Sequence, residues 1–277
     1  MKRRLIIVSY WMLGAALFVF TKPASAQQSP QSKDDAVQPD APVINPGRPT
    51  VSTPATLTPV GYFQFESGVL GAWRSPGLSS QTSVNEVVKF AVSRRVELLV
   101  ASEPFAHTLI ADQSSNDAGG VSLGAQAVLY PGEGAKPTIS ASYFHGVYGG
   151  DAPDLDIGSS TNAALLLASA DLGKFHYDAN LFFSEVVSDP VRRAQFGQSL
   201  SISHPLTRKV GLSGEIWWFT QPFLRSNAVG NLWALNYNAN RDLVFDGGFD
   251  RGLTATSTRW ELFAGFTYLL PRRLFRH

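Results

Sequence analysis

The chain has 277 residues, a formal net charge of +1 and no cysteine. A nearly neutral chain of this kind gives no sign of a nucleic-acid partner. Without cysteine, an exported chain cannot be a disulfide-stapled secreted scaffold.

The first residues have the pattern of a secretory signal peptide. Lys2, Arg3 and Arg4 precede an apolar run, and Ala24-Ser25-Ala26 is a small-residue cleavage site. A retained membrane anchor is the alternative, but the run is short for a membrane-spanning helix. We therefore predict a signal peptide over residues 1–26. Its removal takes away four basic residues and no acid, which changes the net charge from +1 to −3.

Residues 27–59 predict a flexible periplasmic leader. The segment is rich in Gln, Ser, Asp and Pro and has few large apolar groups, so it cannot bury enough surface to order itself. A folded signalling or plug domain is the alternative, but such a domain would need more residues.

From residue 60 to residue 270 the apolar residues recur with a period of two. In the last segment Trp260, Leu262 and Phe266 alternate with Glu261 and Thr267, which is the pattern of a strand with one apolar and one polar face. We predict twelve such strands, at residues 62–73, 82–92, 96–103, 121–130, 138–147, 161–172, 175–185, 194–203, 210–220, 232–238, 243–250 and 260–270. Only residues 162–172 also suit a helix.

The predicted links alternate between short and longer ones. Bacterial membrane barrels have this alternation, with short turns in the periplasm and longer loops outside. We therefore predict an all-β, antiparallel transmembrane β-barrel of about twelve strands, with a C-terminal tail at residues 271–277. The longest outer links, residues 104–120 and 148–160, carry several aspartates and are candidates for a gate or a weak calcium site.

The polar face of each strand should point into the barrel, because a charge at the lipid midplane costs about 2–4 kcal/mol for basic residues. Tyr and Trp gather near the strand ends, where membrane interfaces favour them. The predicted lumen and transport candidates are Gln64, Glu66, Lys89, Glu97, Asp178, Glu215, Asp246, Asp250 and Glu261. Each is either a structural lumen group or a contact for a solute, and Lys89 and Glu97 are placed to meet diagonally. Glu86 breaks the pattern and should lie near a rim or a bulge.

Three short motifs resemble a family of outer-membrane barrels named after the meta-pathway of phenol degradation. They are the Arg48-Pro49 pair followed by a strand with Gln64, Glu66 and Gly68, the run 95–98 (Arg-Val-Glu-Leu) and the run 246–253 (Asp-Gly-Gly-Phe-Asp-Arg-Gly-Leu). The chain departs from the family at Thr50, where Asp is common, and in its tail beyond Tyr268. The resemblance implies a transporter or channel and a link to aromatic compounds.

Enzyme chemistry has little support. No histidine has the companions of a metal site, so we predict no metal and no cofactor. The candidates for a barrel hydrolase are His145 with Ser140 or Ser142, and His176 with Ser184. A soluble periplasmic β-sandwich or closed binding barrel is a further alternative, and it would place large apolar groups inside. A closed outer-membrane barrel with a structural role is the last alternative.

We therefore predict that the chain is not an enzyme. The predicted protein is a passive outer-membrane channel whose partners are outer-membrane lipid and small-molecule solutes, aromatic or hydrophobic compounds among them. A narrow acidic lumen of this kind would mildly disfavour anions.

Overall fold

The structure is a computed structural model that describes residues 42–157, 160–188 and 190–273. The predicted signal peptide and residues 27–41 of the leader lie outside these described residues.

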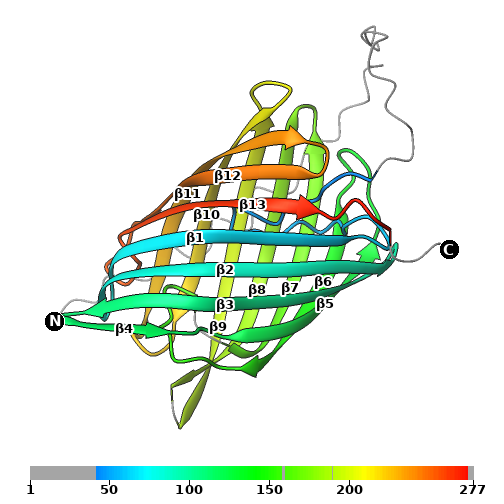
Figure 1. Ribbon diagram of the computed structural model, residues 1–277. Helices are drawn as coiled ribbons and strands as arrows, with labels where there is room; N and C mark the ends of the chain where they lie inside the picture. The colour runs from blue at the N-terminus through cyan, green and yellow to red at the C-terminus, as the bar shows by residue number, and fades with distance from the viewer. Residues whose placement is uncertain (1–41, 158–159, 189, 274–277) are drawn as a thin grey trace, which may run out of the picture. The chain divides into compact units, whose positions relative to one another are not determined.

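Twelve strands form one closed antiparallel barrel (Figure 1). Each strand pairs with its neighbours in the chain, and β1 also pairs with β13, which closes the ring. The short strand β4 (Gln113–Asp117) pairs only with the outer part of β3 and is a hairpin arm outside the ring. The barrel strands are β1 (Phe63–Ser75), β2 (Leu78–Ser93), β3 (Val96–Ile110), β5 (Val121–Tyr130), β6 (Thr138–Tyr148), β7 (Ser160–Leu172), β8 (Phe175–Ser188), β9 (Val191–Pro205), β10 (Val210–Gln221), β11 (Ser226–Asn240), β12 (Leu243–Gly252) and β13 (Trp260–Leu269).

The barrel is apolar outside and polar inside. On β8, Leu181 is 52% exposed on the outer surface, whereas its neighbour Asn180 is 2% exposed and points into the lumen. Successive strand residues face opposite sides, so the alternation seen in the sequence becomes a lipid-facing and a lumen-facing surface. The soluble sandwich, which would bury the large apolar side chains, is wrong.

We call the end of the barrel where β1 begins and β13 ends the terminal end, and the opposite end the mouth. Several strands extend further toward the mouth than predicted. The link between β1 and β2 is only residues 76–77, and most of the predicted loop 104–120 is the hairpin of β3 and β4. The added ends of β1 and β2 and the whole of β4 are mainly polar, so they lack the alternation that marks a membrane strand. The expected longer loops at these links are therefore wrong.

Two ambiguous segments are resolved. The stretch that also suited a helix is strand β7. Glu86 lies beside a register shift between β2 and β3, which is the bulge that its position suggested. Among the described residues, no helix is long and apolar enough to cross a membrane.

Candidate functional site: a plugged lumen and an outer chamber

The leader does not stay outside the barrel. Residues 42–60, which we call the plug segment, run within the ring and are seen in blue behind β13 in Figure 1. The segment enters at the terminal end beside Gln64, reaches Glu215 on β10, and returns to Glu97 at the start of β3. The prediction of a flexible periplasmic leader is therefore wrong for residues 42–59.

The first anchor of the plug segment is Arg48. Its guanidinium contacts the Asp246 carboxylate at 3.2 Å, and the Asp246 side chain is 3% exposed. Gly68 on β1 and Gly265 on β13 are register partners, and a Cβ at either would lie 2.3–2.7 Å from Arg48 nitrogens. The two glycines therefore leave the space that the guanidinium occupies.

The second anchor is a buried ion pair in the wall. Lys89 Nζ lies 2.7 Å from Glu66 Oε1. The same oxygen accepts hydrogen bonds from the Gly47 backbone N–H at 2.9 Å and from Gln64 Nε2 at 2.8 Å. Gln64 in turn pairs with the Asn45 backbone through two hydrogen bonds. Lys89 thus meets Glu66, where the sequence suggested Glu97.

The third anchor is Glu215, at the inner end of the plug segment. Its carboxylate accepts hydrogen bonds from the backbone N–H groups of Val51 and Ser52, both at 2.7 Å, and from Ser52 Oγ at 2.5 Å. Ser52 Oγ also lies 2.7 Å from Ser199 Oγ on β9. One carboxylate therefore satisfies two buried backbone donors, and these hydrogen bonds explain how it can be only 5% exposed.

The returning part of the plug segment is held by neutral groups and one acid. Thr58 donates to Glu97 from its backbone and from its hydroxyl. Further contacts join Thr53 to Asn180, Pro54 to Gln126, and Ala55 to Ser140 and Ser169. The prediction failed because it weighed only apolar burial, whereas these polar residues gain order from hydrogen bonds to the wall.

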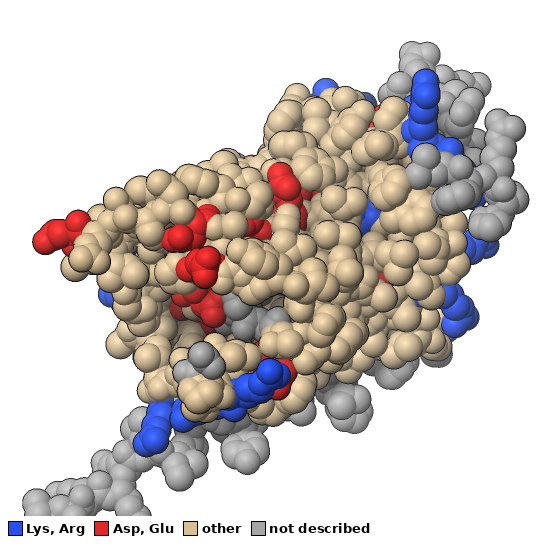
Figure 2. All heavy atoms as spheres, turned by 60° about the horizontal axis from the view of Figure 1, so that its bottom comes forward, with Lys and Arg blue, Asp and Glu red and all other residues tan. Residues whose placement is uncertain are grey.

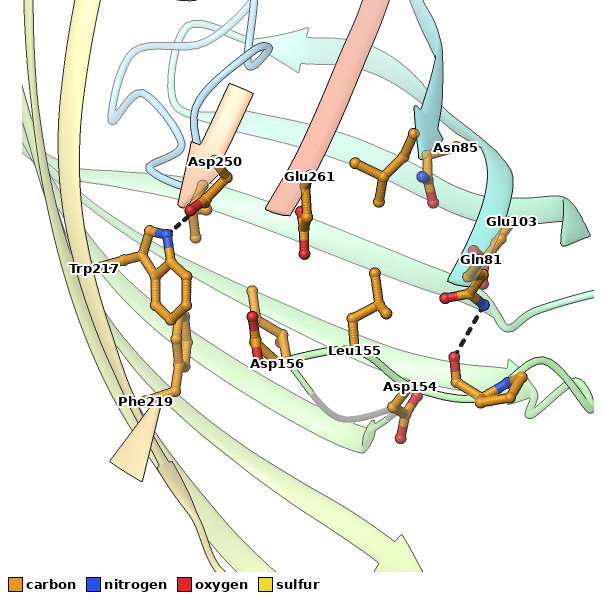
Figure 3. Close-up of a pocket in the computed structure, with 14 residues that line it drawn as sticks. Gln81, Asn85, Glu103, Asp154, Leu155, Asp156, Trp217, Phe219, Asp250 and Glu261 are labelled. Atoms are coloured by element: carbon orange, nitrogen blue, oxygen red, sulfur yellow. Dashed lines mark hydrogen bonds between the residues drawn. The ribbon is translucent and has the colours of Figure 1, made fainter. Parts of the chain in front are cut away.

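Above the plug segment, toward the mouth, lies a chamber of about 330 Å³. Its lining includes Val51 of the plug segment, the aromatic rings of Trp217 and Phe219, and the carboxylates of Asp250 and Glu261 (Figure 3). Trp217 Nε1 donates to Asp250 Oδ2 at 2.5 Å. Trp217, Phe219 and Val51 pack together, so the chamber offers aromatic surface with a carboxylate directly beside it.

The other boundary of the chamber is the link between β6 and β7, whose residues 149–157 we call the mouth loop. Pro153, Leu155 and Asp156 of this loop line the chamber. The loop is held by Gln81 Nε2, which donates to Pro153 O at 3.1 Å, and by the Thr258 N–H, which donates to Asp156 Oδ1 at 2.9 Å. Burial of Asp156 raises the pKa of its carboxyl to about 6.

Acidic side chains gather over part of the surface seen in Figure 2, whereas the Lys and Arg side chains lie at its margins. The mouth loop contributes Asp151, Asp154 and Asp156 to the mouth end. Short turns at the terminal end carry Arg94, Arg95, Lys174 and other basic residues.

The nine predicted lumen residues fall into three groups. Gln64, Glu66, Lys89, Glu97, Glu215 and Asp246 contact the plug segment or one another beside it, whereas Asp250 and Glu261 line the chamber. Asp178 accepts hydrogen bonds from Ser169 Oγ at 2.5 Å and lies 3.2 Å from His176 Nε2. Eight of the nine are at most 8% exposed, and Glu261 is partly exposed.

Sequence reasoning missed the partners of these residues. The plug contacts of Asn45, Arg48, Ser52, Thr53 and Thr58 were not predicted, nor was the place of Asp156 in the chamber. One signal was available, because seven predicted lumen acids faced a single predicted lumen cation, Lys89. Such an excess calls for a second cation, and Arg48 in the leader supplies it.

The hydrolase candidates are not brought together. His145 is exposed on the outer face of β6, whereas Ser140 and Ser142 are buried on the lumen face. His176 and Ser184 are eight residues apart on β8, roughly 26 Å at the rise of a strand. No group of three or more His, Asp or Glu in residues 42–157, 160–188 and 190–273 could hold a metal ion.

No family profile matches the chain, and no curated protein matches it. Solved structures do match in fold. An outer-membrane channel from Pseudomonas putida F1 is similar over 82% of this chain and 100% of its own, with a TM-score of 0.59 and 14% identity. The NanC porin is similar over 74% of this chain and 100% of its own, with a TM-score of 0.52 and 11% identity.

The KdgM porin matches 74% of this chain and 98% of its own, with a TM-score of 0.50 and 9% identity. At such low identities the likeness concerns the fold alone. The chain therefore folds as a twelve-stranded transmembrane β-barrel of the kind found in outer-membrane channels and porins.

Proposed function

We propose that the protein is a channel of the cell outer membrane that passes small solutes and is closed when the plug segment is docked. Three features support the proposal. The fold is shared with an outer-membrane channel and two porins, the outer surface is apolar, and the interior is lined by polar side chains that water can solvate.

The observation that carries the proposal is the chemistry of the plug contacts. The segment is held mainly by hydrogen bonds and one ion pair, and Val51 is its residue in the apolar cluster of Trp217 and Phe219. A hydrogen bond exchanged for one to water changes the free energy by only about 0.5–1.5 kcal/mol. A plug held in this way is displaceable into water, whereas a packed apolar core is not.

The solutes are small and neutral or cationic, aromatic and hydrophobic compounds among them. The carboxylates of Asp250, Glu261 and Asp156 disfavour anions, and Trp217 and Phe219 offer aromatic surface. The motifs shared with the phenol-degradation barrels favour the same class of solute.

A disulfide lock tests whether the plug segment is the gate. Ser52 and Ser199 have their hydroxyl oxygens 2.7 Å apart, and the chain has no cysteine of its own. In the Ser52→Cys/Ser199→Cys variant, oxidation should abolish single-channel current in a planar bilayer, and a reducing agent should restore it.

The matched control is Ser203→Cys/Ser213→Cys, because these hydroxyls lie 2.9 Å apart within the wall and do not involve the plug segment. Its current should not change on oxidation. Equal current through the oxidised and the reduced Ser52→Cys/Ser199→Cys variant would show that the plug segment is not the gate. Absence of current in the wild type and in the reduced lock would favour a closed structural barrel.

A further inference from the structure

Three carboxylates that line the chamber, those of Asp156, Asp250 and Glu261, lie close to one another. Asp250 and Glu261 are direct register partners on β12 and β13, and both experience the charge of Asp156. In the described part of the chain none of the three forms an ion pair. Arg48 and Lys89, the two basic residues that hold the plug segment and its wall, are already paired, since Arg48 contacts Asp246 and Lys89 contacts Glu66. The repulsion among the carboxylates of Asp156, Asp250 and Glu261 is therefore not offset by a basic residue among the described residues.

Two buried acceptors that line the chamber also lack a donor. Asp250 is 4% exposed, and its Oδ1 has no hydrogen-bond partner among the described residues. Gln81 is 3% exposed, and its Oε1 has none either. Burying an acceptor without a donor costs about 1–3 kcal/mol, so such atoms usually meet a donor from water or from a ligand.

The walls of the chamber determine what kind of donor fits. A bare metal ion is a poor match, because no described group of three or more His, Asp or Glu could hold one. The volume of about 330 Å³ suits a small organic molecule. Trp217 and Phe219 provide aromatic faces, which attract organic cations as well as apolar groups. Figure 3 shows the carboxylate of Glu261 between these rings on one side and Gln81 and Glu103 on the other.

We propose that the chamber binds a small organic cation, a primary ammonium that carries an aromatic or alkyl group. The ammonium N–H groups would reach Asp250 Oδ1 and the carboxylate of its register partner Glu261, and the apolar part would lie against Trp217 and Phe219. This inference rests on the proposed function and names the class of solute that the channel selects.

Calorimetric titration of the full-length protein in detergent tests the charge requirement. The probe is 2-phenylethylammonium, compared with neutral 2-phenylethanol and anionic phenylacetate at pH 7.5. We expect saturable binding of the cation, at least tenfold weaker binding of the alcohol, and none of the anion. Equal affinity for cation and alcohol, or no saturable binding of the cation, would overturn the proposal.

Variants test the named acceptors. Asp250→Asn/Glu261→Gln should weaken binding of the cation at least tenfold, and Asn at position 250 keeps an acceptor for Trp217. The control is Asp112→Asn, at the exposed tip of the β3–β4 hairpin, which should leave the affinity unchanged. If the double variant does not fold, Glu261→Gln alone removes one of the two negative charges and should weaken binding at least threefold. Unchanged affinity in a folded variant of either kind contradicts the site.

Combining the titration with the disulfide lock separates this inference from the proposed function. The chamber lies on the mouth side of the plug segment, so the oxidised Ser52→Cys/Ser199→Cys variant should still bind the cation although it carries no current. If the wild type binds the cation but never conducts, the proposed channel function is wrong and the proposed cation site stands. If the wild type conducts but does not bind the cation, the cation site is wrong and the channel function stands.

Discussion

The two halves of the lumen use the same residue types in opposite ways. Around the plug segment, Glu66, Glu215 and Asp246 each have an ion pair or several hydrogen bonds. In the chamber, one oxygen of Asp250 has no donor among the described residues, and its register partner Glu261 forms no ion pair with any of them. Carboxylates that the chain itself satisfies contribute to stability, whereas unsatisfied ones are available to a ligand. The predictions below test this difference.

The largest effect should come from exchanging a carboxylate for an amide in each half. Glu66→Gln leaves Lys89 buried without a counter-charge, which costs about 3–5 kcal/mol. Glu261→Gln removes a repulsion from Asp250 and should raise stability by about 1 kcal/mol. Thermal unfolding, followed by the heat-dependent shift in gel migration, measures both. The same sign for the two variants would contradict the comparison.

Glu215→Ala should release the inner end of the plug segment. The variant leaves the Val51 and Ser52 N–H groups without an acceptor, which weakens docking by about 2–4 kcal/mol. Hydrogen exchange at these two amides should accelerate by more than tenfold. Glu103→Ala, a change in the chamber, should leave their exchange rates unaltered, and a uniform acceleration in both variants would speak against local release.

Docking of the mouth loop should depend on pH through Asp156. Its pKa in the folded protein is about 6, above the ordinary value of 3.8, because burial disfavours the charged form. A raised carboxyl pKa means that the docked loop is most stable at low pH. Docking should therefore lose on the order of 2 kcal/mol as pH rises from about 4 to above 6.

The intrinsically corrected exchange of the Thr258 amide, which donates to Asp156, reports this docking. Its protection should fall between pH 5 and pH 7.5 in the wild type and stay constant in Asp156→Asn. Protection that increases with pH would show that the carboxylate, once charged, strengthens the loop contact.

The smallest effect concerns the space beside Arg48. A Cβ at Gly68 would lie 2.3 Å from Arg48 Nη2, so Gly68→Ala should displace the guanidinium and weaken plug docking by about 1 kcal/mol. The same substitution in an Arg48→Ala background should have no further effect. Hydrogen exchange of the Gly47 amide measures the weakening of plug docking. The control is Gly149→Ala, where a Cβ would meet no atom within 4 Å.

The barrel was predictable because its signal is local and repeated. Strand β5 has the predicted bounds, and all twelve barrel strands overlap the predicted ones. The errors fall where that signal is missing. Strand β4 and the ends of β1 and β2 toward the mouth are mainly polar, so the period of two that marks a membrane strand is lost there.

The candidate site was predictable only in part. The apolar–polar alternation placed Glu66, Asp246 and Glu261 in the lumen. Such an assignment needs only the pattern within one strand, which shows which of its faces is polar. Their partners were not predictable in this way. Arg48 lies 198 positions before Asp246 in the chain, and Asp156 reaches the chamber only because its loop folds inward. Contacts between segments so far apart leave no local periodicity.

The position of Arg48 bears on how the molecule is assembled. The first and last strands meet at the seam between β1 and β13, and the guanidinium lies against Gly68 on one and Gly265 on the other. Its partner Asp246 is on β12, one strand further round. This pocket does not exist until the sheet has joined its own two edges. The full set of Arg48 contacts therefore forms only when the barrel is closed, and it then ties the first strand to the last two from inside the lumen.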